Sequence, residues 1–206
     1  MNLTIQRLEY YQHDGLTFEV IDSGPLVGQP FVLLHGFPET NKSWQQTSKI
    51  LNAQGFRTFA VNQRGYSLKA QPKARSAYRS AALVADINIL LEIIQQPVYL
   101  VGHDWGAVIA WDIAQKYPEK IKHLITISVP HQAAFIHSML SSNQLLKSYY
   151  IGLFQLPIIP ELLFEKFPKI GEALLKNSGM TARATITRFP PRYSAGQTFK
   201  ECLKLV

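Results

Sequence analysis

Short apolar runs alternate with helical patterns over the first 128 residues of the chain. Four runs have the length and composition of strands buried on both faces, at residues 31–34, 56–61, 98–101 and 121–128. Apolar side chains at helical spacing occupy the intervening segments 43–52, 77–95 and 107–116. This alternation predicts an α/β fold: a mostly parallel sheet with helices on both faces, whose ligands bind at the carboxyl ends of the strands.

The two ends of the chain depart from this alternation. Segments 3–13 and 16–22 flank Asp14 and Gly15, a dipeptide that favours a tight hairpin, so we expect an antiparallel pair at the start of the sheet. From Pro130 onward only helical patterns occur, at residues 132–146 and 160–177. We therefore divide the chain into a core at 1–130, a partial helical cap at 131–180 and an unassigned tail at 181–206.

Composition excludes several classes of protein. The 206 residues are 47% apolar and 17% charged, as in a globular domain, and the single cysteine, Cys202, rules out a disulfide framework. The formal charge of +7 is concentrated after residue 180, and no basic stripe with interleaved aromatic residues points to nucleic-acid binding. The chain shows neither an export signal nor the run of about 20 apolar residues that a membrane span needs, so we predict a cytoplasmic protein.

The segment Gly102-His103-Asp104-Trp105-Gly106 follows a buried strand and opens a helix, which is the context of a nucleophile elbow. A side chain displayed on so sharp a turn needs small neighbours two positions away on either side. The displayed side chain is a carboxylate, which is nucleophilic without a base, so Asp104 can attack an electrophilic carbon and form an ester. The alternative is an aspartate that only caps the following helix.

A second loop offers backbone donors to the same site. Residues 35–40, with the sequence HGFPET, follow the strand at 31–34. The Phe37 N–H in this loop and the Trp105 N–H after the nucleophile can point at one oxygen and form an oxyanion hole. We interpret His35 as a structural residue rather than a catalytic base, because a histidine at a strand end usually fixes a loop by hydrogen bonds.

These motifs resemble those of the epoxide hydrolases within the α/β-hydrolase fold. Residues 35–39 resemble the family's HGFPE loop, 102–106 its GHDWG elbow, and 62–67 its DQRGYS segment, where this chain has Asn62 in place of the aspartate. Residues 150–157, YIGLFQLP, are similar to the segment that carries a lid tyrosine. The resemblance covers roughly residues 3–180 and implies an α/β-hydrolase sheet with the start of a helical cap, lacking the final strands.

The resemblance also implies a mechanism. Asp104 would attack an epoxide carbon while Tyr150 and a second tyrosine stabilise the developing alkoxide. The Phe37 and Trp105 amides would then stabilise the oxyanion during hydrolysis of the ester, and we group His35 with them as the oxyanion and substrate-binding residues. The two aromatic rings would line the pocket, so the expected substrate is a small apolar epoxide. We expect no cofactor and no metal ion.

The histidine and acid that complete this mechanism are missing from their expected positions. The strand before the insert ends in Ser128-Val129-Pro130 without an acid, and no histidine follows residue 180. His131 is the one histidine near the expected crevice, at a position that normally forms a hinge. We therefore expect an impaired enzyme, explained by a truncation, a frameshift or an incomplete gene model. The strand at 121–128 would be an uncovered edge, which predicts marginal stability.

Two other functions remain open. A haloalkane dehalogenase shares the Asp-Trp pair of the elbow and the ester intermediate, but a halide is usually held by a second tryptophan or an asparagine beside the oxyanion loop, where this chain has Phe37. A serine-type esterase fits less well because the elbow residue is Asp104. The last alternative is a non-catalytic remnant that binds apolar ligands or has no activity.

Overall fold

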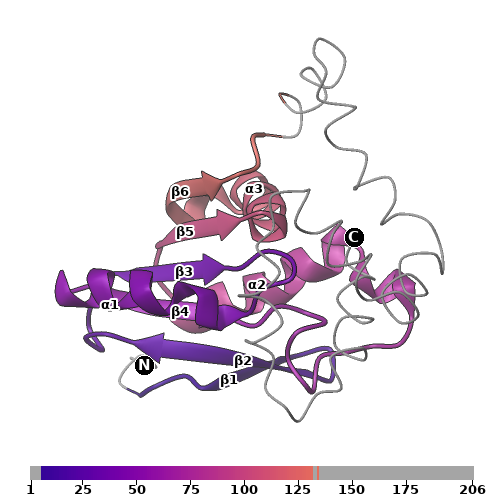
Figure 1. The fold of residues 1–206 in the computed structure, drawn as a ribbon, viewed down its shortest axis with the longest axis horizontal. Helices are drawn as coiled ribbons and strands as arrows, with labels where there is room; N and C mark the ends of the chain where they lie inside the picture. The colour runs from indigo at the N-terminus through magenta and orange to yellow at the C-terminus, as the bar shows by residue number, and fades with distance from the viewer. Residues whose placement is uncertain (1–5, 132–133, 135–206) are drawn as a thin grey trace, which may run out of the picture. The chain divides into compact units, whose positions relative to one another are not determined.

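The computed structural model describes residues 6–131 and 134, and these residues form a six-stranded sheet flanked by helices (Figure 1). The strands are β1 (Tyr10–His13), β2 (Leu16–Ser23), β3 (Pro30–Leu34), β4 (Arg57–Val61), β5 (Val98–His103) and β6 (Ile121–Ile127). Their order across the sheet is β1-β2-β4-β3-β5-β6. Strands β4, β3, β5 and β6 run parallel, while β2 pairs antiparallel with both β1 and β4. The predicted α/β architecture is confirmed.

The antiparallel start of the sheet is the expected hairpin. β1 and β2 pair with His13 opposite Leu16, which leaves Asp14 and Gly15 as a two-residue turn. Both turn residues have positive φ, 50° and 73° respectively, as a tight hairpin turn of this kind requires. The turn dipeptide therefore sets the register of the two strands, as its sequence predicts.

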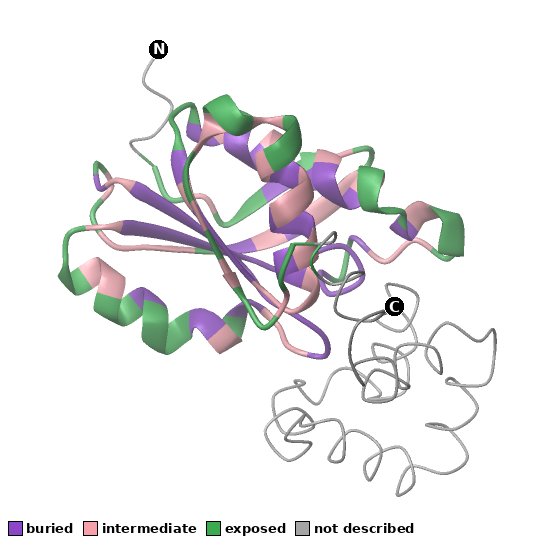
Figure 2. Ribbon diagram, turned by 90° about the horizontal axis from the view of Figure 1, so that it is seen from above, coloured by how far each residue is buried: buried purple, intermediate pink, exposed green. Residues whose placement is uncertain are grey.

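Among the described residues, three α-helices cover the sheet: α1 (Gln45–Ala53), α2 (Ser80–Ile94) and α3 (Trp105–Lys116). Helix α1 lies over one face, and α2 and α3 pack together over the other (Figures 1 and 2). Each helix lies in the sequence between two parallel strands, so each parallel connection crosses over through a helix. Three short 3₁₀ turns complete the connections, at Asn41–Trp44, Arg75–Tyr78 and Pro118–Lys120.

Two of the differences between the element boundaries and the apolar pattern bear on the site or its support. The pattern of the second helix starts at residue 77, but residues 75–78 form a 3₁₀ turn and Arg79, with ψ 145°, is extended before α2 begins at Ser80. The third helix begins two residues earlier than predicted, at Trp105, and β5 runs two residues further, to His103. As a result, Asp104 alone separates the strand from the helix.

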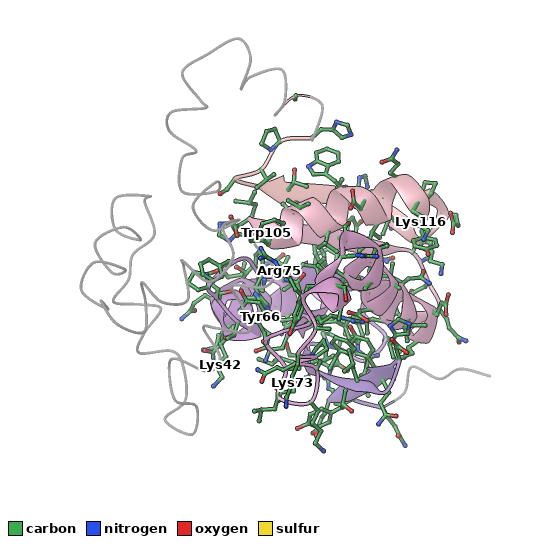
Figure 3. The ribbon with its side chains drawn as sticks, turned by 90° about the vertical axis from the view of Figure 1, so that its right-hand side faces the viewer. Lys42, Tyr66, Lys73, Arg75, Trp105 and Lys116 are labelled. Carbon is green, nitrogen blue, oxygen red and sulfur yellow. The ribbon has the colours of Figure 1, made fainter. Side chains whose placement is uncertain are left out.

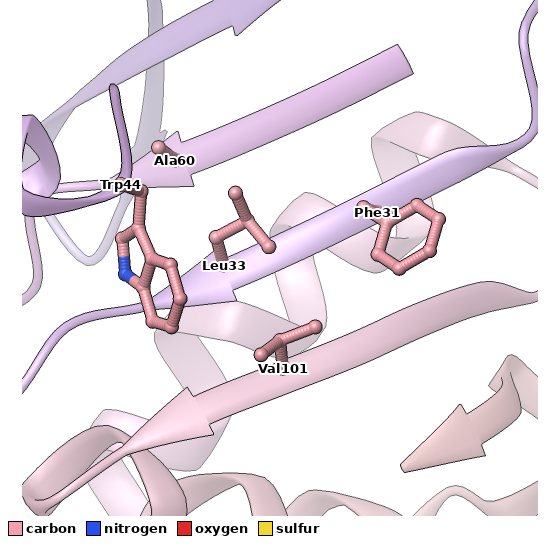
Figure 4. Packing of buried hydrophobic residues seen from close by; sticks show 5 residues of the cluster. All are labelled: Phe31, Leu33, Trp44, Ala60 and Val101. Carbon is pink, nitrogen blue, oxygen red and sulfur yellow. The ribbon is translucent and has the colours of Figure 1, made fainter. Parts of the chain in front are cut away.

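The core lies against the central strands. All residues of β3 and β4 are buried, as expected for parallel strands covered on both faces. Beside α1, the side chains of Phe31, Leu33, Trp44, Ala60 and Val101 form one apolar cluster (Figure 4). Figure 2 shows buried positions concentrated in the central strands, with the exposed positions on the outer sides of the helices. This packing gives the carboxyl ends of β3 and β5 a rigid support.

β6 is the outer strand of the described sheet. Within residues 6–131 it pairs with β5 alone, and Ile125 and Ile127 are 44% and 42% exposed. The chain divides into two compact units, residues 1–131 and 132–206. Except for residues 131 and 134, the predicted cap at 131–180 and the tail at 181–206 lie outside the described residues. None of the helices described combines the length and the apolar composition of a membrane span.

Candidate active site

A single residue joins β5 to α3. Asp104 has φ 51° and ψ −119°, a backbone conformation that residues with a side chain rarely adopt. Hydrogen bonds hold this conformation on both sides: the Asp104 N–H donates to the Ile127 carbonyl (3.1 Å), and the Asp104 carbonyl accepts from the Ala107 N–H (2.9 Å). This is the strand-turn-helix geometry of a nucleophile elbow.

Gly102 and Gly106 allow this turn because their missing side chains make room for backbone atoms. A Cβ atom on Gly102 would lie 2.4 Å from the Gly106 carbonyl oxygen, and one on Gly106 would lie 2.3 Å from the Leu34 carbonyl oxygen. Both distances are well below van der Waals contact, and the opposing atoms belong to the backbone. The two glycines that frame Asp104 are therefore required by the close approach of α3 to β3 and β5.

The loop after β3 contacts the elbow directly. The Phe37 N–H donates a hydrogen bond of 2.9 Å to Asp104 Oδ1. A Cβ atom on Gly36 would lie 2.4 Å from the Asp104 Cβ, so this approach requires glycine. The Asp104 side chain makes no capping hydrogen bond to α3. The geometry therefore supports a carboxylate that is displayed toward the loop, and it does not support the helix-cap alternative.

His35 lies behind this loop. Its side chain is fully buried, its Nδ1 bonds the Gly36 carbonyl (3.0 Å), and its Nε2 accepts from the Gln63 N–H (3.3 Å). Burial lowers the pKa of His35 to about 4, because the charged ring would lose its hydration. The imidazole is therefore neutral at neutral pH. It supports the loop from behind, and its burial keeps it from facing a ligand in this arrangement.

Two consecutive side chains after β4 hold the loop at both ends. At its start, Gln63 Nε2 donates to the His35 carbonyl (2.5 Å). At its end, Asn62 Oδ1 accepts from the Asn41 N–H (2.8 Å), and Asn62 Nδ2 donates to Glu19 Oε2 on β2 (2.9 Å). Asn62 stands out in the sequence as a departure from the family's segment, but its partners lie far away along the chain, so the sequence does not predict these contacts.

An ion pair lies beside Asp104. His103 Nδ1 is 3.7 Å from Glu39 Oε2, and the two side chains are 34% and 32% exposed. The interaction with Glu39 raises the pKa of His103, against the effect of burial, and the nearby Asp104 charge raises it further. The same interaction with His103 lowers the pKa of Glu39. Both residues belong to the two motifs of the site, yet nothing in the sequence predicts that they pair.

The remaining predicted residues are placed as follows. Trp105 is half-buried and is the first residue of α3. Because the first N–H groups of a helix have no acceptor within the helix, the Trp105 N–H has none there. The arrows of β3, β5 and β6 in Figure 1 point toward the side that faces the viewer in Figure 3, where Trp105 and Tyr66 are labelled. The His131 ring packs edge-on against Trp111, with 5.1 Å between ring centroids. Tyr150 lies outside the described residues.

The described residues offer no evident metal site. No three or more histidine, cysteine, aspartate or glutamate side chains among them are grouped so as to hold a metal ion.

Comparison with known sequences places the chain in a family. The family model described as the alpha/beta hydrolase fold matches residues 29–161. The AB hydrolase superfamily protein YfhM of Bacillus subtilis is 38% identical over 157 residues, which cover 75% of this chain and 55% of that protein. Epoxide hydrolase 3 of Xenopus tropicalis is 38% identical over 152 residues, or 72% of this chain and 41% of that protein. The chain thus spans about half the length of the curated relatives it matches.

Solved structures give the same picture. The crystal structure of an epoxide hydrolase from Vigna radiata superposes with a TM-score of 0.70 and 28% identity, over 95% of this chain and 71% of that one. A mutant of an epoxide hydrolase from Bacillus megaterium, in complex with its diol product, gives a TM-score of 0.76 and 25% identity, over 95% and 70% of the two chains. Sequence and structure therefore agree on an epoxide hydrolase-like chain.

Proposed function

Because the chain belongs to the α/β-hydrolase fold family, we propose that it opens epoxide rings with the Asp104 carboxylate as the nucleophile. The observation that carries this proposal is the hydrogen bond of 2.9 Å from the Phe37 N–H to Asp104 Oδ1, at a turn with positive φ. An aspartate at an elbow also suits attack on a haloalkane, and the similarity to epoxide hydrolases favours the epoxide as electrophile.

In the first step, one carboxylate oxygen attacks while the other is held. Phe37 binds Oδ1, which leaves Asp104 Oδ2 to attack an epoxide carbon. The ester C–O bond forms as a ring C–O bond breaks, and the ring oxygen becomes an alkoxide that takes up a proton. We assign the proton donor to Tyr150, on the resemblance of residues 150–157 to the lid segment of the family.

In the second step, water attacks the carbonyl carbon of the ester and negative charge develops on Oδ1. This oxygen already accepts the Phe37 N–H, and the Trp105 N–H at the start of α3 is the second donor of the proposed oxyanion hole. The bond between the acyl carbon and the alcohol oxygen then breaks, one proton of the water passes to the alcohol oxygen, and the other restores Tyr150, so a diol is released and the carboxylate is regenerated. We do not assign the base of this step to His35, because its side chain is fully buried behind the loop.

The surroundings of Asp104 favour a small apolar substrate. Its neighbours in the two motifs, Phe37 and Trp105, are aromatic residues, and we expect their rings to line the pocket with the backbone amides as its polar groups. The charged neighbours, His103 and Glu39, have opposite charges when both are ionised and partly compensate each other. An epoxide with an aromatic or aliphatic substituent matches this arrangement better than a charged one.

The test is to incubate the purified chain with styrene oxide and, in parallel, with 1-bromobutane. We expect a mass increase of one styrene oxide on the peptide that contains Asp104, or release of the diol where hydrolysis follows. The control is Asp104→Asn, which keeps an oxygen for the Phe37 N–H and should form neither adduct nor diol. A wild-type chain that yields neither would contradict the proposal, and release of bromide without epoxide opening would favour dehalogenation.

A further inference from the structure

The side-chain amide of Asn62 lies between two groups with opposite requirements. Its oxygen accepts the Asn41 N–H (2.8 Å), and its nitrogen donates to the Glu19 carboxylate (2.9 Å). These partners fix the orientation of the amide, because a backbone N–H only donates and a carboxylate only accepts. Asn62 is buried, so water cannot readily replace either contact.

The backbones of Glu19 and Asn62 are joined as well. The Asn62 N–H donates to the Glu19 carbonyl (2.9 Å). The Ser67 hydroxyl donates to the Asn62 carbonyl (3.0 Å) and accepts from the Glu19 N–H (2.8 Å). The amide and the carboxylate are therefore brought together by a hydrogen-bonded framework, and their separation does not depend on a flexible side chain alone.

The effect of this pair reaches the nucleophile through the loop at 35–41. Asn62 holds the end of the loop at Asn41, and within the loop the Glu39 N–H donates to the Gly36 carbonyl (2.9 Å) and closes a turn around Phe37. The Phe37 N–H in turn donates to Asp104 Oδ1. A shift of the loop end would therefore move the donor that holds the attacking carboxylate.

We propose that Asn62 and Glu19 form a positioning pair that aligns the Phe37 N–H with Asp104 for the ester-forming step. The inference rests on the proposed function, and neither residue of the pair touches the substrate. The aspartate of the DQRGYS segment, which this chain resembles, would place a second carboxylate against Glu19, and the two charges would repel. Asparagine at position 62 and glutamate at position 19 are thus complementary: the amide satisfies both the loop and the carboxylate.

The test exchanges the two groups. Asn62→Asp sets a carboxylate against Glu19, whereas the double variant Asn62→Asp/Glu19→Gln makes the amide and the carboxylate change places. In the double variant one donor still meets one acceptor, and the Asn41 N–H keeps an oxygen to bind. Glu9→Gln is the matched control, because it makes the same change at an exposed glutamate near β1.

The main measurement is the rate of Asp104 alkylation as a function of styrene oxide concentration. We expect Asn62→Asp to lower the maximal rate on the order of tenfold, because a small misplacement of a positioned group is costly. The half-saturating concentration should change little, since the pair affects orientation and not binding. The double variant should recover most of the rate, and Glu9→Gln should match the wild-type chain. An unfolded fraction would lower the amplitude of alkylation, whereas a misaligned Phe37 N–H lowers the rate constant at full amplitude, so both are measured.

Amide hydrogen exchange gives a second measurement that does not depend on activity. Asn62→Asp should accelerate exchange at Phe37 and Asn41, and the double variant should restore it. If the wild-type chain forms no adduct while exchange follows this pattern, the proposed function fails and the positioning pair is supported. Unchanged alkylation and exchange in Asn62→Asp would overturn the pair, as would a double variant that restores neither. Should Asn62→Asp not fold, a folded double variant supports the pair and an unfolded one overturns it.

Discussion

Asp22 and Asp104 lie at opposite ends of the same sheet and differ in their partners. Asp22, near the end of the antiparallel strand β2, sits beside the first residue of β4. Its carboxylate accepts hydrogen bonds from Arg57 Nε (2.9 Å) and Nη2 (2.5 Å), from Arg7 Nη1 (3.0 Å) and from the Leu8 N–H (2.8 Å). Both oxygens are occupied, and the charge is neutralised.

Asp104 lies at the carboxyl end of β5. Among the described residues, its carboxylate accepts one hydrogen bond, from the Phe37 backbone N–H. Asp86 resembles Asp22 instead, since it receives two hydrogen bonds from the buried Arg64 (2.7 and 2.8 Å). A carboxylate saturated by a guanidinium group holds elements of the fold together. A carboxylate with one amide donor keeps an oxygen for a new bond. The partners, and not the position at a strand end, thus distinguish a structural aspartate from the proposed nucleophile.

Replacing each of the two aspartates by asparagine should give the largest difference in the free energy of unfolding. Asp22→Asn leaves the buried Arg57 guanidinium without its counter-charge, so the free energy of unfolding should fall by about 4 kcal/mol. Asp104→Asn keeps an acceptor for the Phe37 N–H and should change the free energy of unfolding by less than about 0.5 kcal/mol. Urea unfolding of both variants measures the difference, and equal losses would contradict the distinction.

Close packing at the elbow gives the next largest effect. Gly106→Ala places a Cβ 2.3 Å from the Leu34 carbonyl oxygen, and we expect a loss of about 3 kcal/mol, since backbone atoms on both sides must move. Gly55→Ala is the control: no atom lies within 4 Å of its Cβ, and only its φ of +86° opposes the change, at a cost of about 1 kcal/mol. Thermal unfolding compares the two, and a similar loss in both would show that packing is not limiting.

Acid should weaken the end of the sheet that carries the site, with the smallest effect of the three for each unit of pH. The pKa of His35 is lowered from 6.5 to about 4, so between these values the unfolded chain binds a proton that the folded chain excludes. The free energy of unfolding should therefore fall as the pH decreases through this range, by at most roughly 1.4 kcal/mol per pH unit.

His35→Gln tests this linkage. The variant should be less stable at neutral pH, because it loses the packing of the ring against Tyr66, and its stability should decline less steeply in acid. The measurement is urea unfolding at a series of pH values. Parallel pH profiles for the variant and the wild-type chain would exclude His35 as the source of the acid sensitivity.

Local patterns predicted the features that depend on neighbours in the sequence. Fully apolar runs predicted the central strands, the Asp14-Gly15 dipeptide predicted the hairpin, and two glycines around Asp104 predicted a strand-to-helix turn with a displayed side chain. The predicted start of α2 was wrong by three residues, because an apolar period indicates only which side chains face the core. It does not record where Arg79 leaves the helical conformation.

The sequence by itself determined the class of fold and the residue at the elbow, since both follow from spacing rules that act within a few residues. The tertiary structure decided which donor holds Asp104, which charges are neutralised and how the loop at 35–41 is clamped. Those contacts join Asn62 to Glu19 and Arg57 to Asp22, pairs that are 43 and 35 residues apart. They depend on the order of β2 beside β4 and on the register between them, and no local period encodes either one.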